Sequence, residues 1–156
     1  MKNFTEDSPF IQERMKVWAK RQENAIGGRL WEDKAPWELE VFNMFDQKCA
    51  LTRTCIRMTM DHALPRQKGV RGRNGRKNMY PLEFTLNASK NNSHLFKWYE
   101  YNKDKYNLSD ECFNNLITHL AKENDMTPEE YRSYYDTEYE KYIQYKGGKV
   151  RNVRPN

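Results

Sequence analysis

Two N-terminal segments carry apolar residues at helical spacing. The first begins at Ser8-Pro9, because serine is a favoured N-cap and proline a favoured first helical residue, and it ends at Gly27-Gly28. The second covers residues 36–47. The apolar positions are Phe10, Ile11, Met15, Val17 and Trp18 in the first segment, and Trp37, Val41, Met44 and Phe45 in the second. The pattern therefore predicts two helices before residue 48.

The pattern changes from helical to strand-like between residues 49 and 82. Residues 49–65 are rich in Thr, Ile and Met and predict a strand or a hairpin, with a turn near residues 51–55. Residues 66–77 contain three glycines and predict a loop. A short second strand is expected over residues 79–82. This part of the chain therefore predicts a small β element around a glycine-rich loop.

Helical signals return after residue 83. One helix is expected over residues 83–101, a second over residues 109–123, and a third over residues 127–145, where Thr127, Pro128 and Glu130 form a capping box. The third helix carries a tyrosine stripe at positions 131, 135, 139 and 142. Base stacking is one use for such a stripe. Packing within the protein is favoured, because this helix is acidic.

The composition is typical of one folded domain, with 156 residues, 37% of them apolar and 13% aromatic. No apolar run approaches the roughly 18–20 residues of a membrane span, and residues 1–8 contain no signal-peptide core, so we expect a cytoplasmic protein without a membrane partner. Cys49, Cys55 and Cys112 are an odd number and form no CxxC pair. They predict neither a disulfide framework nor a four-ligand zinc site.

The net charge of +5 is unevenly distributed along the chain. Residues 49–77 contain eight basic residues and one acid, and residues 146–156 contain four basic residues and no acid. In contrast, residues 109–145 contain nine acids and three bases. Because Lys and Arg near phosphates release condensed counterions, the basic segments predict a face for a polyanion. A solvated loop of mixed charge is the alternative for the basic run taken alone.

The residues beside the basic loop favour phosphodiester hydrolysis. Asp61-His62 ends the first strand-like segment, Asn78 follows the loop, and Asn87 lies near an expected helix start. Histidine is suited to taking a proton from water near neutral pH. A hard cation that neutralises a phosphate prefers oxygen ligands, which Asp and Asn supply. A general base, two oxygen ligands and phosphate-holding cations therefore occur in one short stretch.

This arrangement resembles the HNH, or ββα-metal, nuclease motif. Asn78 lies sixteen residues after His62 and Asn87 nine residues further, and residues 49–99 look closest to HNH proteins of phages and bacteria, a family that includes homing endonucleases. The resemblance implies that His62 is the general base and that Asn78 braces the loop and orients His62. It also implies that Asp61 and Asn87 bind one Mg²⁺ or Mn²⁺ ion. Asn91 stands where some members carry a second histidine ligand, but an amide is a weak ligand.

Contacts to the DNA backbone are expected from basic residues of the loop and of the following helix. These residues are Arg66, Lys68, Arg71, Arg73, Arg76, Lys77 and Lys90. For Lys90, a position on the helix surface is an equal alternative. They are expected to hold phosphates without reading sequence.

We therefore expect an α+β protein in which a small ββα-metal core is flanked by N-terminal and C-terminal helices. The expected regions are an N-terminal helical region (1–47), a nuclease core (48–105), a C-terminal helical region (106–145) and a basic tail (146–156). The predicted function is a metal-dependent DNA endonuclease, and the alternative is a catalytically inactive nucleic-acid-binding accessory protein. The sequence leaves open whether the protein is a monomer or a homodimer, whether RNA is a further substrate, and whether DNA is nicked or cut in both strands. It also leaves open a homing, restriction or junction-resolving role.

One geometric condition applies to this hypothesis. Neighbouring residues on a regular strand point to opposite faces, so Asp61 and His62 address one phosphate only if the strand ends or bulges at this pair. Pro65 and the loop after it favour an ending. His94 is expected to be an ordinary surface histidine, and His119 has no evident role.

Overall fold

A computed structural model describes residues 35–67, 70 and 73–146. The chain divides into two units, Met1–Leu39 and Glu40–Asn156, and almost all described residues belong to the second. The helix expected over residues 8–28, the basic residues Lys68 and Arg71, and the tail after residue 146 lie outside the described residues.

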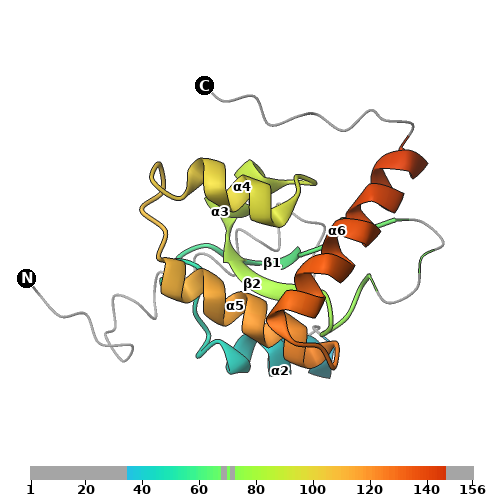
Figure 1. Ribbon diagram of the computed structural model, residues 1–156. Helices are drawn as coiled ribbons and strands as arrows, with labels where there is room; N and C mark the ends of the chain where they lie inside the picture. The colour runs from blue at the N-terminus through green and yellow to red at the C-terminus, as the bar shows by residue number, and fades with distance from the viewer. Residues whose placement is uncertain (1–34, 68–69, 71–72, 147–156) are drawn as a thin grey trace, which may run out of the picture. The chain divides into compact units, whose positions relative to one another are not determined.

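The described part of the chain is α+β, with five helices and one two-stranded antiparallel sheet (Figure 1). The elements in chain order are α2 (Pro36–Met44), β1 (Met58–His62), β2 (Met79–Glu83), α3 (Phe84–Lys90), α4 (Leu95–Asn102), α5 (Asp110–Glu123) and α6 (Pro128–Tyr145). None of the helices in these ranges is long and apolar enough to cross a membrane.

The centre of the second unit is a β1–loop–β2–α3 arrangement. The strands pair in register from Met58 opposite Glu83 to His62 opposite Met79, and α3 begins at the residue after β2 and contacts both strands. Pro81 is tolerated within β2 because each strand of a two-stranded sheet has a free edge, where the missing N–H costs no ladder bond. Its carbonyl accepts a hydrogen bond from Ala50 N at 2.9 Å. The expected second strand is therefore confirmed.

The first strand is shorter than expected. Only Met58–His62 is a strand, whereas the residues around Cys49–Thr54 form a turn closed by a hydrogen bond from Cys49 N to Thr54 O at 2.7 Å. Positive backbone φ angles at Arg53 and Arg57 interrupt extended structure before β1, because a strand requires φ well below zero. The strand ends at His62, but Asp61 and His62 both pair in regular register within it, opposite Tyr80 and Met79, so the condition that the sequence set for this pair is met only in that the strand ends here.

The single helix expected over residues 83–101 is in fact two helices. Asn91 ends α3 with a φ of 46°, a left-handed conformation that asparagine tolerates better than most residues. His94 then caps α4, accepting a hydrogen bond from Lys97 N on its ring nitrogen. Its side chain is 8% exposed, so the expectation of a surface histidine is wrong. The imidazole is buried because it contacts the rings of Tyr135 and Tyr139 and the carboxylate of Asp136.

The two C-terminal helices begin where their capping residues predict. Ser109 accepts a hydrogen bond from Cys112 N at the start of α5, and Thr127 and Glu130 form the reciprocal bonds of a capping box at the start of α6. The tyrosine stripe of α6 is buried, as expected. Within α2, in contrast, Met44 is 47% exposed and Phe42 is buried in place of the expected Met44.

The tyrosines of α6 connect this helix to the ββα centre. The Tyr135 hydroxyl donates to Ala63 O at 2.8 Å and accepts from Leu95 N at 2.9 Å, and the Tyr139 hydroxyl donates to Asn92 O at 3.0 Å. Ala63 directly follows His62, so the C-terminal helix holds the backbone at the end of β1.

Candidate functional site

Asp61 and His62 occupy the end of β1 and have different surroundings. Asp61 is buried, and its Oδ2 atom accepts a hydrogen bond from the Tyr80 hydroxyl at 2.8 Å. Burial, followed by the Asp61 charge, raises the pKa of Tyr80 well above 10, so this phenol remains protonated and can donate. His62 is half-buried and its ring bonds to Asn74 in the loop. Because successive side chains on a strand point to opposite faces of the sheet, Asp61 faces α3 and His62 points to the opposite face.

Lys90 closes this arrangement from α3. Its Nζ lies 2.9 Å from Asp61 Oδ2, donates to His62 O at 2.9 Å and donates to Asn91 O at 3.3 Å. The side chain is 0% exposed. The expectations of a phosphate contact and of a helix-surface position are both wrong for Lys90, because its ammonium group is enclosed by these oxygens. Its observed role is to hold the two residues at the end of β1.

His62 has the protonation state that a base requires. Burial lowers the pKa of His62 below its usual 6.5, although the Asn74 hydrogen bond and the Asp61 charge oppose this shift. The ring is therefore mainly neutral at pH 7. Its Nε2 atom lies 3.1 Å from Asn74 Oδ1. A neutral imidazole that donates from Nε2 to this oxygen keeps its lone pair on Nδ1.

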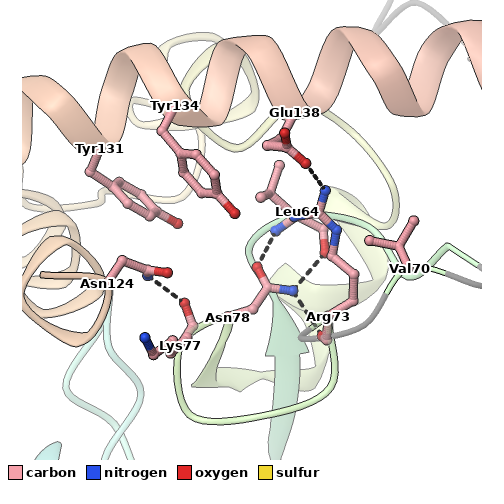
Figure 2. Close-up of a pocket in the computed structure, with 9 residues that line it drawn as sticks. All are labelled: Leu64, Val70, Arg73, Lys77, Asn78, Asn124, Tyr131, Tyr134 and Glu138. Atoms are coloured by element: carbon pink, nitrogen blue, oxygen red, sulfur yellow. Dashed lines mark hydrogen bonds and ion pairs between the residues drawn. The ribbon is translucent and has the colours of Figure 1, made fainter. Parts of the chain in front are cut away.

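Asn78 braces the loop after His62, and Figure 2 shows its contacts. Its Oδ1 accepts from Leu64 N at 2.8 Å, and its Nδ2 donates to Leu64 O and to Arg73 O, both at 2.9 Å. The side chain is 4% exposed. One amide thus satisfies three buried backbone groups, and it fixes the backbone two residues after His62.

Asn87 lies on α3 against β1, on the same face as Asp61. Its Nδ2 donates to Thr59 Oγ1 at 2.8 Å. The Thr59 hydroxyl donates its single hydrogen to Leu82 O at 2.7 Å, so it must act as the acceptor from Asn87. This fixes the orientation of the amide and turns Oδ1 of Asn87 away from Thr59. Thr59 and Asp61 are two residues apart on β1 and therefore share one face.

The two expected ligands each retain one oxygen that fits a hard cation. Within the described residues, Asp61 Oδ1 and Asn87 Oδ1 have no hydrogen-bond partner, while the other polar atom of each side chain is fixed by its neighbours. Carboxylate and amide oxygens are the donors that Mg²⁺ accepts. The same ranges contain no cluster of three or more His, Cys, Asp or Glu side chains arranged for a metal. Within them, no hydrogen bond or ion pair joins Asp61, His62 and Asn87 side chains directly.

The basic loop is partly neutralised within the protein. Arg73 is paired with Glu138 of α6 at 2.7 Å, with side-chain exposures of 8% and 18%. Arg76 is paired with Glu123 at 2.8 Å and with Glu40 at 3.0 Å. The expectation that Arg73 holds a backbone phosphate at the surface is therefore wrong, because its guanidinium group is buried against α6.

Two basic residues of the described loop retain exposed side chains. Arg66 is exposed, and Lys77 is 59% exposed with only a 3.9 Å approach to Asp125. The expected polyanion face thus keeps Arg66 and Lys77 as accessible cations, with Arg76 partly occupied by its two carboxylate partners.

Three residues that position the site were not predicted from the sequence. Thr59 orients Asn87, Tyr80 holds Asp61, and Asn74 holds the His62 ring. The strand register carries a signal for Tyr80, because this residue is directly opposite Asp61. Asn74 lies in an irregular loop, where residue spacing gives no equivalent signal.

Comparison of the chain with family models, with curated proteins and with solved structures finds no match.

Proposed function

We propose that this protein is a metal-dependent endonuclease that hydrolyses DNA phosphodiester bonds. The observation that carries the proposal is the end of β1, where a half-buried neutral histidine follows a buried carboxylate and precedes a loop braced by Asn78. The β1–loop–β2–α3 order and the position of Asn87 beside β1 support the same reading. These features support the roles that the HNH resemblance implies for His62, Asn78 and Asn87.

In this proposal His62 accepts a proton from water. The lone pair on Nδ1 takes the proton, and Asn74 keeps the ring in place from the Nε2 side. The resulting hydroxide attacks phosphorus, and the 3′ oxygen leaves. Because the pKa of His62 is lowered, the base form is present at neutral pH.

Asp61 and Asn87 are the residues that would hold the cation. A bound Mg²⁺ or Mn²⁺ ion would supply positive charge to the phosphate and to the departing oxygen. Lys90 and Tyr80 keep Asp61 Oδ2 in place and leave Oδ1 for such an ion. Arg66 and Lys77 are the exposed cations proposed to hold the DNA backbone.

A specific observation favours the second candidate, a nucleic-acid-binding accessory protein without turnover. The ammonium of Lys90 contacts Asp61 at 2.9 Å and compensates its charge, which lowers the attraction of this carboxylate for a cation. Such a protein would retain the fold and the exposed basic side chains.

A plasmid-nicking assay with supercoiled DNA separates the two candidates. We expect conversion to the nicked or linear form with Mg²⁺ or Mn²⁺, and none with EDTA. Binding of the plasmid in a gel-shift experiment, without cleavage under any divalent cation, would favour the accessory protein and reject the enzyme. Parallel reactions with RNA in place of the plasmid test whether RNA is also cleaved.

A further inference from the structure

Asn74 is the only asparagine of the chain that is followed by a glycine. Asparagine is chemically labile, because its side-chain amide reacts with the backbone nitrogen of the next residue. A glycine in that position hinders the approach least, since it has no Cβ and its backbone is the most adaptable. The pair lies in the loop between β1 and β2, where the Asn74 side chain is exposed. The sequence therefore contains one favoured position for loss of a side-chain amide.

The attacking atom of this pair is free to move. Within the described residues, the backbone nitrogen of Gly75 donates no hydrogen bond. Space is also open on its Cα, because no atom beyond the neighbouring residues lies within 4 Å of the position that a Cβ would take. Asn92 provides a contrast, since it is exposed too but the next nitrogen, Ser93 N, donates to Lys90 O at 2.9 Å. The nitrogen after Asn74 can turn toward the side chain without breaking a hydrogen bond.

The Asn74 side chain is held by its oxygen and not by its nitrogen. His62 Nε2 lies 3.1 Å from Oδ1 and donates to it in the neutral Nε2–H form. This hydrogen bond draws electron density from the carbonyl carbon that is attacked, and it stabilises the negative charge that develops on Oδ1. The leaving atom, Nδ2, has no hydrogen-bond partner in the part of the chain that the structure describes. The contact thus polarises the amide and leaves its nitrogen free to depart.

We propose that Asn74 is a site of deamidation. The backbone nitrogen of Gly75 bonds to Cγ of Asn74 and the Cγ–Nδ2 bond breaks, which gives a succinimide ring. Nδ2 leaves as ammonia, with the proton that Gly75 N–H gives up. Water then opens the ring at either carbonyl group and produces aspartate or isoaspartate. The net reaction adds one water and releases one ammonia, and it needs no other reactant.

The modification adds a carboxylate at the residue that now contacts the His62 ring through an amide oxygen. In the proposed nuclease, on which this consequence alone rests, the new negative charge lies beside the base and repels the phosphate of the substrate. Cleavage then declines as the protein ages. The modification itself does not depend on that activity.

Peptide mass spectrometry of the full chain, incubated at pH 7.5 and then digested, tests the proposal. We expect the peptide with Asn74 to exchange an NH₂ group for an OH group, while the peptide with Asn92 keeps its mass. Gly75→Ala is the test variant. Its methyl group fits, because the space is open and the φ angle of Gly75 lies outside the left-handed region. The methyl group hinders the attacking nitrogen, so we expect modification of Asn74 to be at least about tenfold slower.

The variant Ser93→Gly separates the effect of the sequence from that of the structure. It creates a second asparagine–glycine pair at Asn92, whose following nitrogen is engaged by Lys90 O. We expect Asn92 in this variant to be modified more slowly than Asn74.

Two results would overturn the proposal. One is an Asn74 peptide that keeps its mass as long as the Asn92 peptide of the original protein does. The other is modification of Asn92 in the Ser93→Gly variant at the rate of Asn74, which would mean that the free nitrogen and the His62 contact have no effect. Cleavage by fresh and incubated protein is measured separately. Absence of cleavage by the fresh protein would reject the proposed nuclease, whereas the peptide masses alone decide the modification.

Discussion

At the scale of single residues, the central feature is the buried contact between Lys90 and Asp61. A charge pair in the interior does not stabilise a fold simply by its attraction, because both groups lose their hydration. Here the remaining donors of Lys90 are used by His62 O and Asn91 O, and Tyr80 shares Asp61 Oδ2. The pair therefore holds the Asp61 carboxylate and the backbone carbonyl group of His62 in place at the end of β1.

The first prediction concerns removal of one partner of this pair. Lys90→Met leaves the Asp61 carboxylate buried without a counter-charge, and we expect a loss of about 3–5 kcal/mol of unfolding free energy at pH 7. The double variant Lys90→Met with Asp61→Asn should recover a large part of the loss, because the uncompensated charge is gone. Denaturant unfolding measures the free energy of unfolding of the single and the double variant. Equal stability of Lys90→Met and the original protein would show that the pair is not buried as described.

The second prediction concerns the protonation of His62. Asn74→Asp places a carboxylate beside the His62 ring in place of an amide oxygen. An adjacent negative charge favours the imidazolium form, so the pKa of His62 should rise relative to the original protein. An NMR titration of the imidazole resonances reports the change without needing any activity. An unchanged or lower pKa would mean that residue 74 does not contact the ring.

At the scale of elements, the loop between β1 and β2 is held from two sides. Asn78 holds it from the start of β2, and Arg73 and Arg76 connect it to α6 and to the end of α5. The hydroxyl of Tyr135 adds a bond from α6 to the residue after His62. The C-terminal helices thus support the loop that follows Asp61 and His62 of the candidate site.

A third prediction follows for the brace itself. Asn78→Ala leaves Leu64 N, Leu64 O and Arg73 O without their side-chain partner. Because unsatisfied buried groups cost about 1–3 kcal/mol each when water cannot replace the partner, we expect a clear drop in melting temperature. Asn43→Ala, at an exposed position of α2, is the control and should have a small effect. Similar melting temperatures for the two variants would argue against a bracing role.

The sequence predicted those elements whose signals are local. The starts of α5 and α6 follow from Ser109 and from the Thr127 capping box, because a cap is made by residues a few positions apart. The division between α3 and α4 was missed, because it depends on a left-handed backbone at Asn91. At the site, the buried state of Asn78 matches its expected bracing role, whereas the burial of Lys90 and Arg73 depends on partners far along the chain.

At the scale of the whole chain, ion pairs between described residues compensate part of the unevenly distributed charge. Two arginines of the basic loop contact acids of the acidic C-terminal segment, as the pairs Arg73–Glu138 and Arg76–Glu123 show. A run of positive charge in a sequence is therefore not by itself a binding face, because its partners can lie in the same molecule. Among the described residues of the basic loop, Arg66 and Lys77 retain exposed side chains for a polyanion.

The fourth prediction concerns the pH dependence of stability. Burial lowers the pKa values of all three histidines, His62, His94 and His119, below their usual 6.5. Below about pH 6.5 the unfolded chain then binds more protons than the folded chain, so stability falls as the pH falls. We expect a lower melting temperature at pH 5.5 than at pH 7.5, by about 2–4 °C for each kcal/mol lost. A flat or rising melting temperature over this range would contradict the burial of these rings.

The most direct test of the central claim is the rate of plasmid cleavage by His62→Ala in the presence of Mg²⁺ at pH 7.5. The account predicts a rate roughly 10²–10⁴-fold lower than that of the original protein, the usual scale for loss of a general base, with DNA binding unchanged. His119→Gln is the matched control, since His119 lies on α5 and packs against Phe45, and it should cleave at the original rate. Cleavage by His62→Ala at the original rate would contradict the assignment of His62 as the base.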